Sequence, residues 1–495
     1  MNETEMKNSG RRIGAVDFFF IGFGSIVGVG WAVSINGWMA SCGGPVPAAL
    51  GYLLVLAMLI PIALCYCELV PMYPVAGGGM IFAFKGFNRH IAMLSGWTAF
   101  GAFVAIVPWE AIQVTDVLGY LIPALKSGDP VYRLAGSDIY LSSLIMGVSF
   151  SILIFLLNIR GFAAAAKAQK ILCSVLVSAA LVGAVFSLIG GQRSNLLPVY
   201  DVSNPGIYGS GLRQVNHQTL FGGAFSIVAS AAFFLAGFET IPQGIESAGG
   251  EPRSVGKTVV FSVLAACLFY ACLLFCYGCG MPWQEFALVN RPAAASLFLF
   301  VFPGKLGKVL FWLLALGAVA GLFTPWNGFF TPSANLLMCM GRGRMLPGIF
   351  ARQNKKGIAV YGLIVVLLLS CVGPFLGPNL IDSITCFSSA AFMLSWSITA
   401  WSLVACRLRY PDQKRPYRIP GGIVMGIYAG LVSLAAFVFM FVPSSPFYIG
   451  AVAVKMFLGW TVLGAVLYLS CAGQRKNLSA EAFEKGLFGS NDAAR

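Results

Sequence analysis

The chain is dominated by long apolar stretches that recur along most of its 495 residues. Hydrophobic residues make up 58% of the sequence, charged residues only 10%, and the mean hydropathy is +0.82. A water-soluble core cannot bury so many apolar runs of about 20 residues, the length that crosses a bilayer as a helix. The sequence therefore predicts an all-α polytopic membrane protein.

Twelve transmembrane spans are predicted from these runs. Several exceed the roughly 20 residues that cross a bilayer, which indicates tilt, breaks or extension beyond the lipid. Residues 293–303 are too short to span, and we expect a helix lying at the membrane surface there. The predicted spans are residues 14–40, 45–70, 91–123, 139–158, 168–190, 221–245, 257–280, 306–340, 358–377, 382–406, 421–442 and 447–471.

The distribution of positive charge predicts the orientation in the membrane. With the N-terminus inside, the tails and inner loops carry 24 of the 32 Lys and Arg residues, the outer loops carry 7, and Lys455 lies in span 12. Basic loops face the cytoplasm, so both termini are predicted to be cytoplasmic, in a multi-pass protein of the plasma membrane, with a bacterial inner membrane favoured. The formal charge of +14 is then explained by contact with anionic lipid, and nucleic acid is not expected as a partner.

Cysteine and histidine usage argues against a metal or redox site. Most of the 13 cysteines fall within predicted spans, where they act as small packing residues. Cys276 and Cys279 have C-x-x-C spacing, but no second Cys or His pair complements them. The two histidines, His90 and His217, lie in predicted loops on opposite sides. We expect no cofactor, no metal and no enzymatic activity.

Glycines interrupt two of the predicted spans. Four lie within IGFGSIVGVG of span 1, and Gly237 lies within FFLAGFET of span 6. A glycine weakens a helix by about 1 kcal/mol relative to alanine, and opened backbone in lipid needs partners. Matching breaks in two halves of a membrane chain point to a solute site near the bilayer middle. Close helix packing through the Gly24 and Gly28 spacing is the alternative; a dinucleotide fingerprint is excluded because no strand precedes it.

Five segments, in order, carry a family resemblance. They are GFGSIVGVG in span 1, YPVAGGGMIFAF (73–84), FFLAGFETIPQGIESAGGEPRSVGK (233–257), MGRGRMLPGIF (340–350) and LRYPDQKRPYRIPGG (408–422). Together they resemble the amino acid permeases of the amino acid/polyamine/organocation superfamily. The resemblance implies alternating access and a five-plus-five inverted repeat with broken helices 1 and 6, plus two C-terminal helices. The implied divisions are an N-tail (1–13), repeats at 14–190 and 221–406, two spans at 421–471 and a C-tail (472–495).

The resemblance also implies a substrate site at the two breaks. It places the substrate carboxylate on backbone amides of span 1 and the ammonium on backbone carbonyls of spans 1 and 6. This agrees with the partial positive charge at a helix N-terminus. Phe233 matches an aromatic gate on the outer side, with simple packing as the alternative. The implied amides are those of Ser25, Ile26, Val27 and Gly28. The implied carbonyls are those of Gly22, Phe23, Phe233, Leu235 and Ala236, and Gly237 marks the span 6 break.

Two carboxylates at membrane depth are candidates for coupling or charge recognition, because buried charge is costly. Glu239 follows the span 6 break and matches an acidic position typical of the family. It either ties spans 6, 1 and 8 together through hydrogen bonds or acts as a protonatable switch. Glu110, beside Pro108 in span 3, either recognises a substrate amine, carries a proton or lies in an outer vestibule without a specific role.

Two departures from the family pattern limit the mechanism. The span 5 lysine of proton-coupled members falls here near Leu176, so coupling through that lysine is not expected. Asn335 stands where many relatives carry arginine. Symport, exchange and uniport therefore stay open for a secondary transporter of amino acids or related amines, with protons as a possible second ligand. The alternatives are a polyamine or cationic amino acid exchanger, and a non-transporting amino acid sensor. The oligomeric state is not predicted.

Overall fold

The computed structural model describes residues 13–201, 219–289, 292–445, 447–476 and 480–488. The predicted N-tail therefore lies outside the described residues apart from Ile13. The first part of the chain forms the helices α2 (Ala15–Ile26), α3 (Gly30–Val33), α4 (Ile35–Cys42), α5 (Pro45–Met72), α6 (Gly79–Gly86), α7 (Arg89–Leu121), α8 (Leu141–Asn158) and α9 (Phe162–Gly190).

The second part is also helical. Its helices are α10 (Leu220–Ser226), α11 (Val228–Leu235), α12 (Thr240–Gln243), α13 (Pro252–Gly278), α14 (Trp283–Phe286), α15 (Ala293–Val301), α16 (Lys305–Arg342), α17 (Val360–Leu376), α18 (Ile381–Arg409), α19 (Gly422–Phe439), α20 (Ala451–Ser470), α21 (Ala472–Lys476) and α22 (Ala480–Phe488). The protein is an all-α polytopic membrane protein, as the apolar runs predict.

Ten segments of the described chain are long and apolar enough to cross a membrane. Two further apolar segments fall short of that length. Helix α17 has 17 residues, and residues 220–243 are divided among α10, α11 and α12. These two segments are the predicted spans 9 and 6, so the count of twelve stays a prediction.

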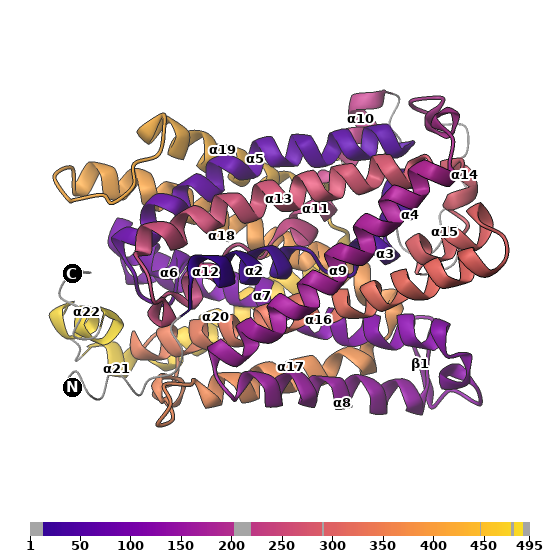
Figure 1. Cartoon of the computed structure of the whole chain (residues 1–495). Helices are drawn as coiled ribbons and strands as arrows, with labels where there is room; N and C mark the ends of the chain where they lie inside the picture. Colours follow the sequence, from indigo (N-terminus) through magenta and orange to yellow (C-terminus); the bar gives the residue numbers. More distant parts are fainter. Residues whose placement is uncertain (1–12, 202–218, 290–291, 446, 477–479, 489–495) are drawn as a thin grey trace.

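The helices form a bundle with α2 near its centre (Figure 1). Helix α2 packs against α13, α9 and α16. The central helices α7 and α18 are mostly buried, whereas α8 and α20 expose most of their apolar residues. Exposed apolar helix faces are expected where lipid is the solvent. We call the end with α6, α12 and α22, on the left of Figure 1, the inner end, because the charge pattern predicts that it faces the cytoplasm.

Two elements near the opposite, outer end differ from expectation. A short antiparallel hairpin joins β1 (Tyr132–Leu134) to β2 (Ser137–Ile139), which the span pattern did not predict. Within it a hydrogen bond from Arg133 lowers the pKa of the Asp138 carboxyl. The segment predicted to lie at the membrane surface forms α15, but Ala293–Phe298 are buried against neighbouring helices. Its apolar run therefore serves helix packing, and its depth in the membrane stays a prediction.

Candidate substrate site at two broken helices

The span 1 break lies between α2 and α3. Helix α2 ends at Ile26, and Val27 is extended while its N–H still donates to the carbonyl of Phe23 at 2.7 Å. The next amides, of Gly28 and Val29, have no backbone acceptor within the described chain. The Ile26 carbonyl accepts a hydrogen bond from the Tyr270 hydroxyl at 3.3 Å. The break therefore offers amides without a backbone acceptor directly before α3, and such N–H groups can bind an anion.

The break begins later than the sequence predicts. Ser25 and Ile26 are helical and the Val27 amide is bonded, so only Gly28 of the four predicted amides lacks a backbone acceptor. The carbonyls predicted at Gly22 and Phe23 also lie within α2, and that of Phe23 is bonded to Val27.

The physical reason is that two of the glycines serve close packing within a continuous helix. A Cβ atom on Gly22 would lie 2.5 Å from Ile241 Cδ1, and one on Gly24 would lie 2.6 Å from Gln169 Nε2. Their low helix propensity is offset by the close approach of neighbouring helices, which is the packing alternative for this motif.

The span 6 break lies between α11 and α12. Helix α11 ends at Leu235, Ala236 is extended, and Gly237 has φ +144°, a conformation that other residues rarely adopt. The carbonyls of Phe233, Leu235 and Ala236 accept no backbone hydrogen bond in the described chain. This break lies where the sequence predicts it, and the role of these carbonyls in holding an ammonium stays a prediction.

The two breaks pack directly against each other. A Cβ atom on Gly237 would lie 2.6 Å from Ile26 N, so the site needs glycine for space as well as for conformation. Thr240 Oγ1 donates to Gly237 O at 2.6 Å and to Ser25 Oγ at 3.2 Å. Segments more than 200 residues apart thus place opened backbone in one location.

A small enclosed pocket lies beside the breaks. Its volume of about 20 Å³ is enough for roughly one water molecule. An amino acid is several times larger, so the pocket in this structure has no room for one. The lining residues are Ser25, Ile26, Gly28, Val29, Gly30, Ile106, Trp109, Glu110, Phe233, Phe234 and Pro325.

Glu110 belongs to this pocket and not to an open vestibule. Its side chain is only 2% exposed, and its Oε2 atom has no hydrogen-bond partner among the described residues. Phe233 is also buried and lines the same pocket, with its ring centroid 5.2 Å from that of Trp109. Sequence reasoning named Glu110 and Phe233 but missed Trp109 and Phe234. The available signal was that each of these two aromatic residues is the chain neighbour of a predicted one.

Glu239 connects different helices from those expected. Its Oε2 atom accepts a hydrogen bond from the Gly237 amide at 2.7 Å, and its Oε1 atom accepts one from the Trp396 indole of α18. The tie predicted between spans 6, 1 and 8 is therefore a tie between spans 6 and 10. The carboxylate caps the opened turn after Gly237, because an acceptor is needed where the helix ladder stops.

Four uncharged side chains form a hydrogen-bonded network beside the span 1 break. Asn327 Nδ2 donates to Gln169 Oε1 at 2.8 Å, and Gln169 Nε2 donates to Thr324 O at 2.9 Å. Asn327 Oδ1 accepts from Asn158 Nδ2 at 3.0 Å, and Thr324 Oγ1 donates to Val27 O at 2.9 Å. We call these four side chains the amide network. It joins α8, α9 and α16 to the span 1 break.

Asn335 has a structural role that the sequence did not indicate. Its Nδ2 atom donates to Gln243 O at 2.9 Å, at the last residue of α12. An amide donor at a helix C-terminus satisfies a carbonyl that the helix leaves open. Asn335 therefore holds the inner half of the broken span against α16.

Comparison with known proteins decides the family. A family model described as amino acid permease matches residues 13–466, which is most of the chain. The chain belongs to the amino acid permease family. The match spans both breaks, the pocket and the amide network, so this permease carries its candidate site inside the region that defines the family.

Curated relatives of the permease are distant in sequence. A branched-chain amino acid permease of Bacillus subtilis, BcaP, is 20% identical over 96% of this chain and 95% of the relative. A chloroplastic cationic amino acid transporter of Arabidopsis thaliana is 26% identical over 69% of this chain and 57% of the relative. An aspartate-proton symporter of Bacillus subtilis is 23% identical over 86% and 78%, respectively.

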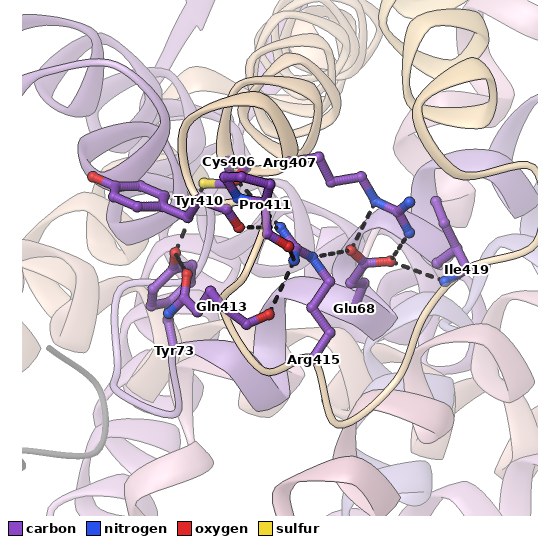
Figure 2. Close-up of polar contacts among 9 residues, drawn as sticks. All are labelled: Glu68, Tyr73, Cys406, Arg407, Tyr410, Pro411, Gln413, Arg415 and Ile419. Carbon is purple, nitrogen blue, oxygen red and sulfur yellow. Dashed lines mark hydrogen bonds and ion pairs between the residues drawn. The ribbon is translucent and has the colours of Figure 1, made fainter.

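The permease also contains a buried charge cluster at its inner end, which sequence reasoning missed. Glu68 of α5 is fully buried and accepts two hydrogen bonds from Arg407, of 2.9 and 2.6 Å. Arg415 and the Ile419 amide donate to the same carboxylate at 3.1 and 2.9 Å (Figure 2). The signal was one acidic residue late in span 2 and several arginines in LRYPDQKRPYRIPGG. We call Glu68, Arg407, Arg415 and Ile419 the inner cluster.

Proposed function

We propose that this permease is a secondary transporter of amino acids or related amines, working by alternating access. The observation that carries the proposal is the contact between the span 6 break and the last turn of α2, directly before the span 1 break, where Gly237 lies against the Ser25–Ile26 peptide. Amides at the start of α3 suit a substrate carboxylate, and carbonyls at the end of α11 suit an ammonium. The twelve-span, five-plus-five arrangement with cytoplasmic termini in a bacterial plasma membrane is part of this proposal.

In this proposal the substrate carboxylate contacts the amides that lack a backbone acceptor, and not all four amides that the sequence predicts. Gly28 remains the anion-facing residue, with Val29 beside it. Gly22, Phe23, Ser25 and Ile26 support the break as helical residues. Phe233, Leu235 and Ala236 supply the carbonyls, and Gly237 allows the turn.

Flux measurements test the proposal. Purified permease in proteoliposomes is expected to take up radiolabelled amino acids or amines from a panel, with and without trapped unlabelled substrate. Stimulation by trapped substrate indicates exchange, whereas equal rates indicate uniport. Binding without any flux would instead make the chain a sensor on the same scaffold and would contradict the proposal.

A variant of the break sharpens this test. Gly237→Ala is expected to abolish flux, because the new Cβ atom would meet Ile26 N at 2.6 Å and φ +144° is strained for alanine. Gly304→Ala is the matched control, since Gly304 also has positive φ but a Cβ atom there meets no atom within 4 Å. Normal flux in Gly237→Ala would remove the break from the mechanism.

The names of two relatives bear on ion coupling and on the substrate class. The name of the aspartate-proton symporter favours protons as a second ligand, with Glu110 and Glu239 as the carboxylates that carry them. The name of the cationic amino acid transporter favours cationic amino acids as substrates. The second candidate function is the exchange of cationic amino acids or polyamines. The unpartnered carboxylate of Glu110 is the observation in this permease that favours that candidate.

A further inference from the structure

Glu110 is a buried glutamate whose carboxylate forms no ion pair with any described residue and whose Oε2 atom has no hydrogen-bond partner among them. It lies on α7, next to Trp109 and about one turn after Ile106, and all three residues line the pocket. The same pocket is lined by Gly28 and Val29, whose amides open toward a substrate carboxylate in the proposed function. Glu110 is therefore beside the proposed substrate and not in a separate part of the protein.

The surroundings of Glu110 supply no positive charge. None of the lining residues of the pocket is Lys, Arg or His. The carboxylate takes part in no ion pair among the described residues. Its Oε2 atom has no hydrogen-bond partner among them either, although the residue is only 2% exposed. An unpaired carboxylate in a low-dielectric site is costly, so it is stabilised by binding either a proton or a cation.

Aromatic rings form the adjacent wall of the pocket. The Trp109 centroid lies 5.2 Å from that of Phe233 and 6.0 Å from that of Phe234. Aromatic faces attract organic cations, with tryptophan the strongest, and the attraction increases when water is excluded. A carboxylate beside such rings suits an ammonium or guanidinium group carried on an aliphatic chain.

Charge balance selects the substrate class. A neutral zwitterionic amino acid brings one carboxylate and one ammonium, and these two charges suit the helix ends at the breaks. Glu110 would then have to bind a proton to become neutral. A substrate with one additional positive charge balances the pocket.

We propose that Glu110, Trp109 and Phe233 form a cation subsite, and that the permease prefers substrates with a second positive group, namely dibasic amino acids and diamines. This inference rests on the proposed function and names its substrate class. The α-amino group stays with the backbone carbonyls of α11, and the side-chain cation lies against Glu110.

A matched pair of substrates tests the subsite. L-lysine and L-norleucine share the same aliphatic side chain up to the terminal ammonium, which norleucine lacks. In competition against a labelled amino acid in proteoliposomes, lysine is expected to bind about 10-fold or more tightly than norleucine, the value of one charge-assisted hydrogen bond. Glu110→Gln is expected to remove most of this preference while keeping norleucine affinity within about twofold.

Two further variants control for folding and long-range charge. Glu110→Asp keeps the charge on a shorter side chain and is expected to retain part of the lysine preference. Asp116→Asn removes a negative charge from the same helix, but Asp116 is paired with Lys126 at 2.8 Å and partly exposed. This variant is expected to keep the full preference.

Three results would overturn the cation subsite. Equal affinity for lysine and norleucine in the unmodified permease would show that charge is not read. Loss of both substrates to the same extent in Glu110→Gln would assign Glu110 to the α-amino group. Loss of acid-stimulated norleucine uptake with an unchanged lysine preference would make Glu110 a proton carrier. In each case flux of some amino acid leaves the proposed function intact, whereas absence of all flux contradicts the proposed function itself.

Discussion

The inner cluster and the pocket both bury a glutamate of a membrane-spanning helix, but they treat its charge in opposite ways. Glu68 meets two guanidinium groups and a backbone amide, so every part of its carboxylate is compensated (Figure 2). Glu110 is equally buried, yet its Oε2 atom has no partner among the described residues. The difference teaches that burial alone does not mark a functional carboxylate, because a compensated charge stabilises the fold, whereas an uncompensated one is left to bind a proton or a ligand.

Glu239 lies between these two cases. It accepts a backbone amide and an indole N–H, but no ion pair joins it to a described basic residue. The same change from glutamate to glutamine at all three positions therefore tests how stability depends on the number and the charge of the partners that the carboxylate has.

Glu68→Gln is expected to have the largest effect on stability. Removing this charge leaves Arg407 and Arg415 uncompensated in a site where the carboxylate was fully buried. Breaking a buried pair in this way costs about 3 to 5 kcal/mol. Thermal unfolding of the purified protein in detergent measures it. A loss below about 1 kcal/mol would mean that the cluster is solvated in solution and would remove one side of the comparison.

Glu239→Gln is expected to cost about 1 to 3 kcal/mol. The amide can accept from one donor, but its NH₂ group then faces the second donor, leaving one of Gly237 N and Trp396 Nε1 unsatisfied. The same unfolding assay measures this loss. Stability equal to that of the unmodified protein would indicate that Glu239 is already protonated there, so that its hydroxyl group already faces one of the two N–H donors.

Arg407→Lys tests whether geometry matters within the inner cluster. The guanidinium reaches both carboxylate oxygens of Glu68, whereas an ammonium keeps the charge but not the two-bonded fork. We expect a loss of about 1 kcal/mol, comparable to one hydrogen bond. A loss as large as that of Glu68→Gln would contradict the view that charge compensation dominates the cluster.

Glu110→Gln is expected to have the smallest effect, within about 0.5 kcal/mol of the unmodified protein or slightly stabilising. No described partner is lost, and an unpaired buried charge is removed. The measurement is again unfolding in detergent without substrate. Destabilisation by more than about 2 kcal/mol would reveal a structural partner for Glu110. The carboxylates of the inner cluster and of the pocket would then both stabilise the fold.

The sequence predicted the membrane helices well, because runs of about 20 apolar residues leave few alternatives in lipid. It also placed the Gly237 break correctly, since a glycine before a polar FET segment interrupts an otherwise apolar helix. The span 1 break was misplaced because Gly22 and Gly24 look like helix breakers in sequence. In the fold they are contact points, where Ile241 and Gln169 approach the helix.

Partners distant in sequence were beyond prediction. Glu68 and Arg407 are 339 residues apart, and nothing in either segment names the other. The same limit applies to Glu239, whose family position indicated a tie but whose indole partner on α18 depends on how the helices cross. Glu110 was found because a lone carboxylate at depth is conspicuous, but its lack of a partner could be read only from the packed structure.

The amide network has a consequence for how the permease responds to its surroundings. Asn158, Gln169, Thr324 and Asn327 join the span 1 break to three other helices through carboxamides, a hydroxyl and backbone groups. None of these groups titrates at physiological pH or carries a net charge on which membrane voltage could act. The joint is therefore electrically silent, so a proton gradient or membrane potential can drive this carrier only through charges located elsewhere.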